Sequence, residues 1–247
     1  MTAAGFLAGT GLLALFVVLS AARYLGSSAA RIVLAGLGGW LAYVGTLSAL
    51  GLVSNPSLKP PGVLYIVFPV VGFVALFAVR SERGGAIARA LPIGLLMGAQ
   101  VFRVGVELGL HTLWQQGLVP RLMTYEGGNV DILIALSAPV VAWLTLRGQV
   151  GRRAAIAWNV LGLLALANII VRSALTAPGP LNFIRSEVPN LAIGTFPYTY
   201  VAGFLAPLAV TLHVLSIRHL LSRSASAGPL FAGTGRFGQA TPPASAK

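Results

Sequence analysis

The 247 residues of the chain are 56% hydrophobic and only 9% charged, with a mean hydropathy of +0.85. Because soluble domains carry roughly a quarter charged residues, this composition excludes a soluble enzyme and predicts an all-α, polytopic membrane protein. The net charge of +12 does not indicate nucleic-acid binding, since the basic residues are scattered at the ends of apolar runs, and the absence of cysteine excludes a disulfide-stapled secreted module.

Seven apolar runs approach the roughly 20 residues that a helix needs to cross the hydrocarbon core of a bilayer. In chain order they are residues 3–22, 32–53, 62–79, 90–116, 130–147, 154–176 and 196–221. No basic residue precedes the first run, so we expect a retained helix and not a cleaved signal peptide. The pattern predicts a seven-helix transmembrane domain over residues 1–221. Residues 222–247 are rich in Ser, Ala, Gly and Pro, which predicts a disordered cytoplasmic tail.

The basic residues divide unevenly between the two sides of this predicted bundle. Arg103 and Arg172 lie inside spans, and Lys59, Arg121 and Arg185 lie on one side. The other side carries Arg23, Arg31, Arg80, Arg83, Arg89, Arg147, Arg152, Arg153, Arg218, Arg223, Arg236 and Lys247. Since cytoplasmic loops carry an excess of Lys and Arg, we expect the N-terminus outside and the C-terminus in the cytoplasm.

The fourth predicted span carries a polar stripe at spacings of three and four residues, which keep its members on one helix face. The stripe consists of Gln100, Arg103, Glu107, His111 and Trp114. Glycines with G-x-x-x-G spacing, which permits close helix packing, lie on the opposite face. They are Gly94, Gly98, Gly105 and Gly109. We therefore expect this helix at the centre of the bundle, packed by its glycines and facing an internal polar site.

Ionisable side chains in a membrane need partners, because each costs roughly 2.5–3.5 kcal/mol near the bilayer centre. Arg103 and Glu107 are four residues apart and can pair with each other. In the sixth span Asn168 and Arg172 share a face, which makes Arg172 a candidate partner for Glu107 or Asp131. The same pattern equally fits a buried salt-bridge network that only fixes the register of the helices.

The outer loop after the fourth span mixes hydroxyl, carboxylate and amide groups between Thr124 and Asp131. Asn129 or Asp131 could simply cap the fifth span. Alternatively, the loop folds back over the mouth of the bundle and presents Glu126 to the His111 end of the fourth span.

A resemblance rests on this loop and on the spans around it. The motif comprises Met123-Thr124-Tyr125-Glu126-Gly127, Asn129 and Asp131-Ile132, with Arg103 and Glu107 upstream and Phe196-Pro197-Tyr198, Pro207 and His213 downstream. Over spans four to seven the chain resembles a group of uncharacterised bacterial seven-helix membrane proteins. The resemblance implies a multi-pass protein of the bacterial inner membrane and carries no activity with it.

We interpret these features as a non-enzymatic bundle that binds, senses or transports a small polar ligand or ion from its outer side. The expected ligand-binding residues are Arg103, Glu107, His111, Glu126, Asn129, Asp131, Asn168 and Arg172. No residue is assigned a catalytic role. The lipid bilayer is the one partner that the composition requires.

Two other functions fit the same residues. The first is a membrane-embedded enzyme that holds a divalent metal on Glu107 and His111, one turn apart, with Glu126 and Asp131 completing a site of nitrogen and oxygen ligands. His213 is expected near the cytoplasmic face, too far from His111 to join it. The second is a structural or assembly subunit whose polar stripe meets a partner helix or a second copy.

Overall fold

The computed structural model describes residues 2–179 and 182–225, and every regular element within these ranges is a helix. The elements in chain order are α1 (Ala3–Leu25), α2 (Ser27–Ala49), α3 (Leu64–Gly72) with the π-helical turns Phe73–Arg80, α4 (Glu82–Ala90), α5 (Ile93–Gly98) with the 3₁₀ turn Ala99–Val101, α6 (Phe102–Gln115), the 3₁₀ turns Arg121–Met123 and Tyr125–Gly127, α7 (Asp131–Leu146), α8 (Arg152–Thr176), the 3₁₀ turn Ala192–Gly194, and α9 (Ala206–Ala225) with the preceding π-helical turn Val201–Leu205. The last helix, α9, continues to Ala225, past residue 222, where the predicted tail begins. Residues 226–247 lie outside the described residues.

Five of these helices are long and apolar enough to cross a membrane: α1, α2, α5 with α6, α8, and the segment Val201–Ser222. A sixth candidate is Leu64–Arg80 together with α4, although the two parts are bent by 71°. α7 has 16 residues, which span about 24 Å at 1.5 Å per residue, short of the roughly 30 Å hydrocarbon core. The all-helical prediction is therefore confirmed, with five to six candidate spans by helix length.

The bend before α4 has a local cause. Ser81 adopts an extended conformation and caps α4, its hydroxyl accepting a hydrogen bond from the Gly84 amide at 2.9 Å. Arg218 of α9 donates to the carbonyls of Ala78 at 2.7 Å and Ser81 at 2.9 Å, where the preceding helix ends. A side chain on Gly85 would meet this guanidinium at 2.6 Å, so the glycine leaves the space that Arg218 occupies.

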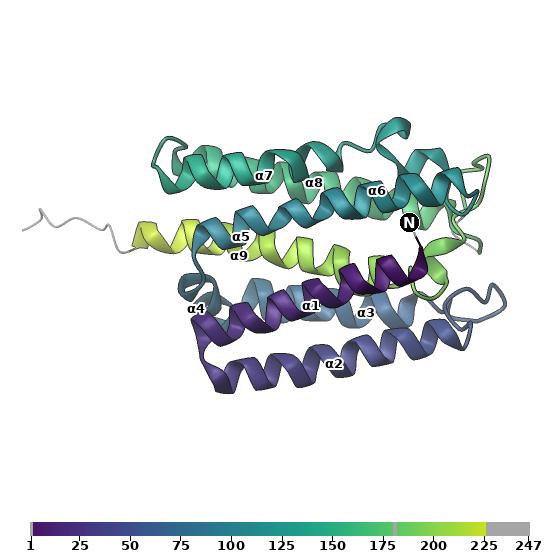
Figure 1. Cartoon of the computed structure of the whole chain (residues 1–247), viewed down its shortest axis with the longest axis horizontal. Coiled ribbons are helices and arrows are strands. Elements are labelled where there is room, and N and C mark those ends of the chain that lie inside the picture. Colours follow the sequence, from purple (N-terminus) through teal and green to yellow (C-terminus); the bar gives the residue numbers. More distant parts are fainter. Residues whose placement is uncertain (1, 180–181, 226–247) are drawn as a thin grey trace, which may run out of the picture.

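Figure 1 shows α5, α6 and α9 in the middle of the bundle, with α7 and α8 on one side and α1, α2 and α3 on the other. The expected glycine face is present only in part. A Cβ on Gly94 would lie 2.6 Å from Leu146 of α7, and one on Gly98 would lie 3.6 Å from Ala142, so α5 packs closely on α7. Gly105 has open space around it and lines a groove beside α1.

The long connecting segments gather at one end of the bundle (Figure 1). There the chain after α6 packs against the segment before α9, and the amides of Leu191 and Ala192 both donate to the Leu118 carbonyl at 3.1 Å. Val119 and Met123 are buried against Leu113, together with apolar residues of α8 and of the later segment. This end of the bundle is therefore closed by a folded plug, residues 118–130.

Candidate functional site

Arg103 is the largest of the fully buried side chains of the described residues, with an exposed fraction of 2%. Its guanidinium faces the carboxylate of Asp131, the first residue of α7: Nε donates to Oδ2 at 2.8 Å, and Nη2 donates to Oδ1. A bidentate pair of this kind holds the guanidinium and the carboxylate in one relative orientation. The structure thus pairs Arg103 with Asp131 and not with Glu107, which follows it four residues later on the same helix.

His213 of α9 is the third member of this cluster. Nη1 of Arg103 lies 3.0 Å from His213 Nε2, and His213 Nδ1 lies 2.9 Å from Oδ1 of Asn159 on α8. Because a guanidinium only donates, Nε2 is the acceptor and Nδ1 carries the hydrogen that bonds to Asn159. Asn159 in turn donates to the Ala155 carbonyl at 2.8 Å.

The position of His213 depends on the glycine opposite it, Gly162 of α8. A Cβ on Gly162 of α8 would overlap the imidazole ring, so glycine is the residue that lets α9 bring His213 against α8. The Trp158 ring lies 5.5 Å from the imidazole, centroid to centroid, and closes another side.

His213 lies nearer the middle of the bundle than predicted. The predicted span begins at residue 196, whereas the helix begins at Val201, and five residues shorten the depth of His213 by about 7.5 Å. His213 therefore reaches Arg103, although it does not join His111. Neither His213 nor Asn159 was among the predicted site residues. A polar side chain inside an otherwise apolar run is the signal that could have selected them: Asn159 in the sixth predicted span and His213 in the seventh.

Glu107 is buried to 1% exposure, and both of its carboxylate oxygens accept hydrogen bonds from the same amide nitrogen of Asn129, at 2.8 and 2.9 Å. The side-chain Oδ1 of Asn129 accepts from the backbone N–H of Asp131 at 3.2 Å, so the Asn129 side chain links Glu107 to the start of α7. Within the described residues no basic side chain forms an ion pair with Glu107.

These contacts make one continuous set, which we call the buried polar network. It joins α6, α7, α8, α9 and the plug. Its members are Glu107, Asn129, Asp131, Arg103, His213 and Asn159.

His111 belongs to a second cluster, nearer the closed end of the bundle and partly exposed. Its Nδ1 lies 3.7 Å from Oε1 of Glu126, whose other oxygen lies 4.0 Å from Nε of Arg121. The imidazole stacks on Tyr125 at 4.9 Å between centroids, and its Nε2 lies 3.1 Å from the Gln115 amide. The second of the two loop predictions therefore agrees with the structure: the segment folds back and brings Glu126 to His111.

Asn168 and Arg172 lie apart from both clusters. The Arg172 Nε donates to Asn168 Oδ1 at 3.1 Å, and Nη1 donates to the carbonyls of Leu122 at 3.1 Å and Gly127 at 3.0 Å. Arg172 thus fastens the plug to α8 and is not the partner of Glu107 or Asp131. The eight predicted residues are therefore divided among three places.

The predicted metal pair is also divided. Glu107 faces Asn129, whereas His111 faces Glu126. Among the residues that the structure describes, no three His, Cys, Asp or Glu side chains come together in a group that could hold a metal ion. The geometry therefore gives the divalent-metal enzyme no support.

One comparison with known proteins gives a match. A family model described as "Domain of unknown function (DUF8737)" matches residues 60–221. No curated protein and no solved structure matches the chain. The matched region contains the whole buried polar network, whereas α1 and α2 lie outside it.

Proposed function

Since the chain belongs to the DUF8737 family and its buried polar network lies in the family's region, we propose that it is a multi-pass membrane protein that binds one small ion of unit positive charge at Glu107. A monovalent metal cation and a proton share this charge. The ion enters from the end that the plug closes. The observation that carries the proposal is the Glu107 carboxylate, buried with a neutral amide as its hydrogen-bond donor.

Charge balance supports a cation. The buried polar network contains two carboxylates, Glu107 and Asp131, and one guanidinium, that of Arg103. His213 adds no charge in the hydrogen-bonding arrangement above, because its Nε2 accepts from Arg103. One negative charge is left over where the surroundings are apolar and unpaired charge is costly. A bound cation at Glu107 removes it.

The route to Glu107 passes the second cluster. His111 lies one helical turn beyond Glu107 on α6, and its side chain is 17% exposed, against 39% for Glu126. These groups supply a partly solvated carboxylate and imidazole between the surface and the buried carboxylate. Residues 118–130 must shift for an ion to enter, because Asn129, which covers Glu107, is 2% exposed.

The position of Arg103 favours a carrier or a sensor over an open pore. Its guanidinium bonds Asp131 on one side and His213 on the other. A cation that moves from Glu107 past Asp131 toward His213 therefore meets a fixed positive charge. Fixed arginines act as electrostatic barriers to cations in membrane pores. Binding from one side, coupled to a change of conformation, fits this arrangement better than conduction through the bundle.

We place the protein in the bacterial plasma membrane with seven crossings, the N-terminus outside. An odd number of crossings is supported by the positions of the first and last helices: α1 begins near the end with the long connections, and α9 ends at the other (Figure 1). Counting α7, the fifth in chain order, brings the number of crossings to seven, and the plug continues α7 to the outer surface. The basic residues that flank the short connections support the orientation.

The test is ion-dependent stability of the purified full-length protein in detergent. The midpoint of thermal unfolding is measured in Na⁺, Li⁺ and K⁺ against N-methylglucamine at constant ionic strength, at several pH values. A ligand at about 100 times its Kd stabilises the folded state by about 2.7 kcal/mol, so the midpoint rises with the ion that binds. Glu107→Gln abolishes this rise, whereas the control Glu126→Gln, at the partly exposed carboxylate, retains most of it.

The series of metal cations and the series of pH values distinguish a bound metal cation from a bound proton. A midpoint that responds to one metal cation identifies that cation, and a midpoint that responds to pH alone, in wild type but not in Glu107→Gln, identifies the proton. If Glu107→Gln keeps the wild-type response, or if wild type responds to neither, the buried polar network only fixes helix register.

A further inference from the structure

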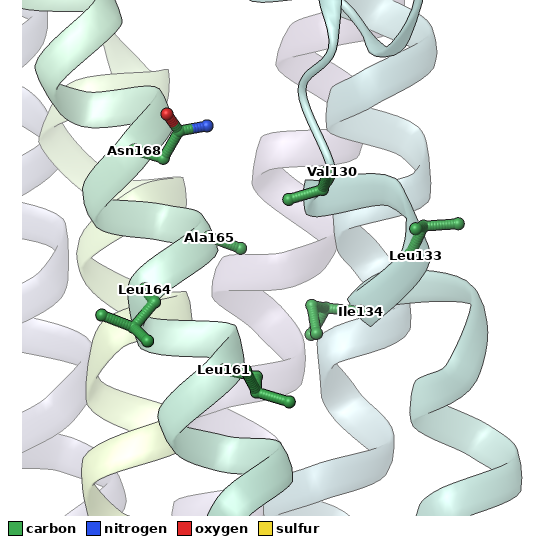
Figure 2. A pocket seen from close by; sticks show the side chains of 7 residues that line it. All are labelled: Val130, Leu133, Ile134, Leu161, Leu164, Ala165 and Asn168. Carbon is green, nitrogen blue, oxygen red and sulfur yellow. The ribbon is translucent and has the colours of Figure 1, made fainter.

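A groove runs along the membrane-facing side of the bundle between α7 and α8 (Figure 2). Its volume is about 360 Å³. Six of its seven lining residues are apolar: Val130, Leu133, Ile134, Leu161, Leu164 and Ala165, with Asn168 as the seventh. Leu133 and Leu164 are 62% and 60% exposed, so the groove opens outward and not into the bundle.

One end of the groove is polar. Figure 2 shows the side-chain amide of Asn168 with its nitrogen directed from α8 across the groove toward the Val130 side. Its oxygen accepts from Arg172, while its nitrogen donates to no acceptor within the described residues. A hydrogen-bond donor is therefore available at the head of an apolar channel.

The charge at this end is not balanced by the protein. Arg172 follows Asn168 by one turn, and its partners are that amide and two backbone carbonyls. Among the described residues no carboxylate forms an ion pair with it. An unpaired guanidinium four residues before the end of α8 suits an anionic group in the headgroup layer of a bilayer.

We propose that this groove binds one phospholipid with an anionic headgroup. The lipid phosphate pairs with Arg172, an ester carbonyl of the lipid accepts from the Asn168 amide nitrogen, and one acyl chain lies along the groove past Leu164 to Leu161. From Asn168 to Leu161 the helix rises about 10 Å, so the groove holds the upper part of the chain. The order of phosphate, ester and chain in a lipid matches the order of Arg172, Asn168 and leucines along α8.

A lipid bound at this site would also stabilise the plug. The same guanidinium that meets the phosphate holds the carbonyls of Leu122 and Gly127, the two ends of the segment that includes Tyr125. A bound phosphate keeps Arg172 at this position and so stabilises the plug. This inference does not depend on an ion at Glu107, because Arg172 and Glu107 have different hydrogen-bond partners in the plug.

The experiment is native mass spectrometry of the full-length protein, stripped of lipid and then titrated with phosphatidylglycerol or phosphatidylcholine of identical acyl chains. Both lipids carry the phosphate, but the choline ammonium of phosphatidylcholine repels the Arg172 guanidinium. We therefore expect one phosphatidylglycerol to remain bound, with an affinity at least tenfold higher than that for phosphatidylcholine. Leu164→Trp fills the groove and lowers the phosphatidylglycerol affinity at least tenfold. The matched control is Leu136→Trp, at a lipid-facing leucine of α7 that is 57% exposed and does not line the groove.

The headgroup contact has its own pair of variants. Arg172→Gln removes the preference for phosphatidylglycerol. The control Arg185→Gln changes an exposed arginine in the segment between α8 and α9 and leaves the preference unchanged. Equal binding of the two lipids, equal effects of the two arginine variants, or full binding by Leu164→Trp would each overturn the proposal. A shift from dimer to monomer on Leu164→Trp, without loss of lipid, would overturn it in favour of a second copy of the chain.

Discussion

The α1–α2 hairpin and the α5–α9 bundle are both built from apolar helices but are held in different ways. In the most apolar stretch of α1 and of α2, 11% of the residues are buried. The corresponding share is 33% in α8 and 44% in Ile93–Gln115 and in Val201–Ser222. Within a bilayer, apolar surface alone does not drive helices together, because lipid tails are as apolar as leucine. Polar contacts and small residues decide which helices pack closely.

The polar contacts follow the same division. The hairpin is tied to the rest of the chain by single hydrogen bonds, such as Trp40 Nε1 to the Gly203 carbonyl at 2.6 Å and the Ser48 and Thr199 hydroxyls at 2.6 Å. The α5–α9 bundle instead encloses paired charges and the whole buried polar network. Apolar length thus suits a helix to the membrane, whereas buried charged and polar side chains link α6, α7, α8 and α9 to one another.

The largest expected effect comes from breaking the ion pair of the bundle. Asp131→Leu leaves the Arg103 guanidinium buried without its ion-pair partner, and breaking a buried pair in this way costs about 3–5 kcal/mol. Denaturant titration in mixed micelles measures the loss. The double variant Arg103→Met with Asp131→Leu removes both charges and regains most of the stability. An Asp131→Leu protein as stable as wild type would show that the pair contributes nothing to the packing of α6 on α7.

A smaller effect is expected where glycine admits the imidazole. Gly162→Ala places a methyl group against the His213 ring, which hydrogen bonds to Arg103 and Asn159 hold in place, and such overpacking costs about 1–3 kcal/mol. The control is Gly105→Ala, where an added Cβ meets nothing within 4 Å and stability is unchanged or slightly higher. The unfolding midpoint measures both variants. Equal midpoints would mean that α8 and α9 are less closely packed at His213 than the structure shows.

The smallest effect belongs to the hairpin. Trp40→Phe removes the hydrogen bond to Gly203, and side-chain hydrogen bonds between membrane helices contribute about 0.6 kcal/mol on average. Its control is Trp143→Phe, at an exposed indole of α7. The response of stability to ions should survive Trp40→Phe unchanged. If Trp40→Phe instead abolishes that response, the hairpin is part of the ion site and the contrast between the two regions is wrong.

Part of the candidate site was predictable because it lies on one element. The spacing of Arg103, Glu107 and His111 follows from helical periodicity, so their common face on α6 needs no knowledge of the fold. The return of Glu126 to His111 was one of two readings of the loop and agrees with the structure. The partners were not predictable: Arg103 could reach Glu107 by spacing, but it meets Asp131 because α7 begins beside it.

The amino-acid sequence determined that the chain is helical and suited to a membrane, because backbone amides in hydrocarbon must be satisfied within each apolar segment, and that requirement is local. Tertiary structure alone decided that His213 and Asn159 join the arginine, that Glu107 faces an amide, and that Arg172 fastens the plug. Those choices depend on where each helix begins, how closely glycine lets two helices approach, and how the long connections fold back. They are set by contacts between residues distant along the chain, which spacing within one element does not encode.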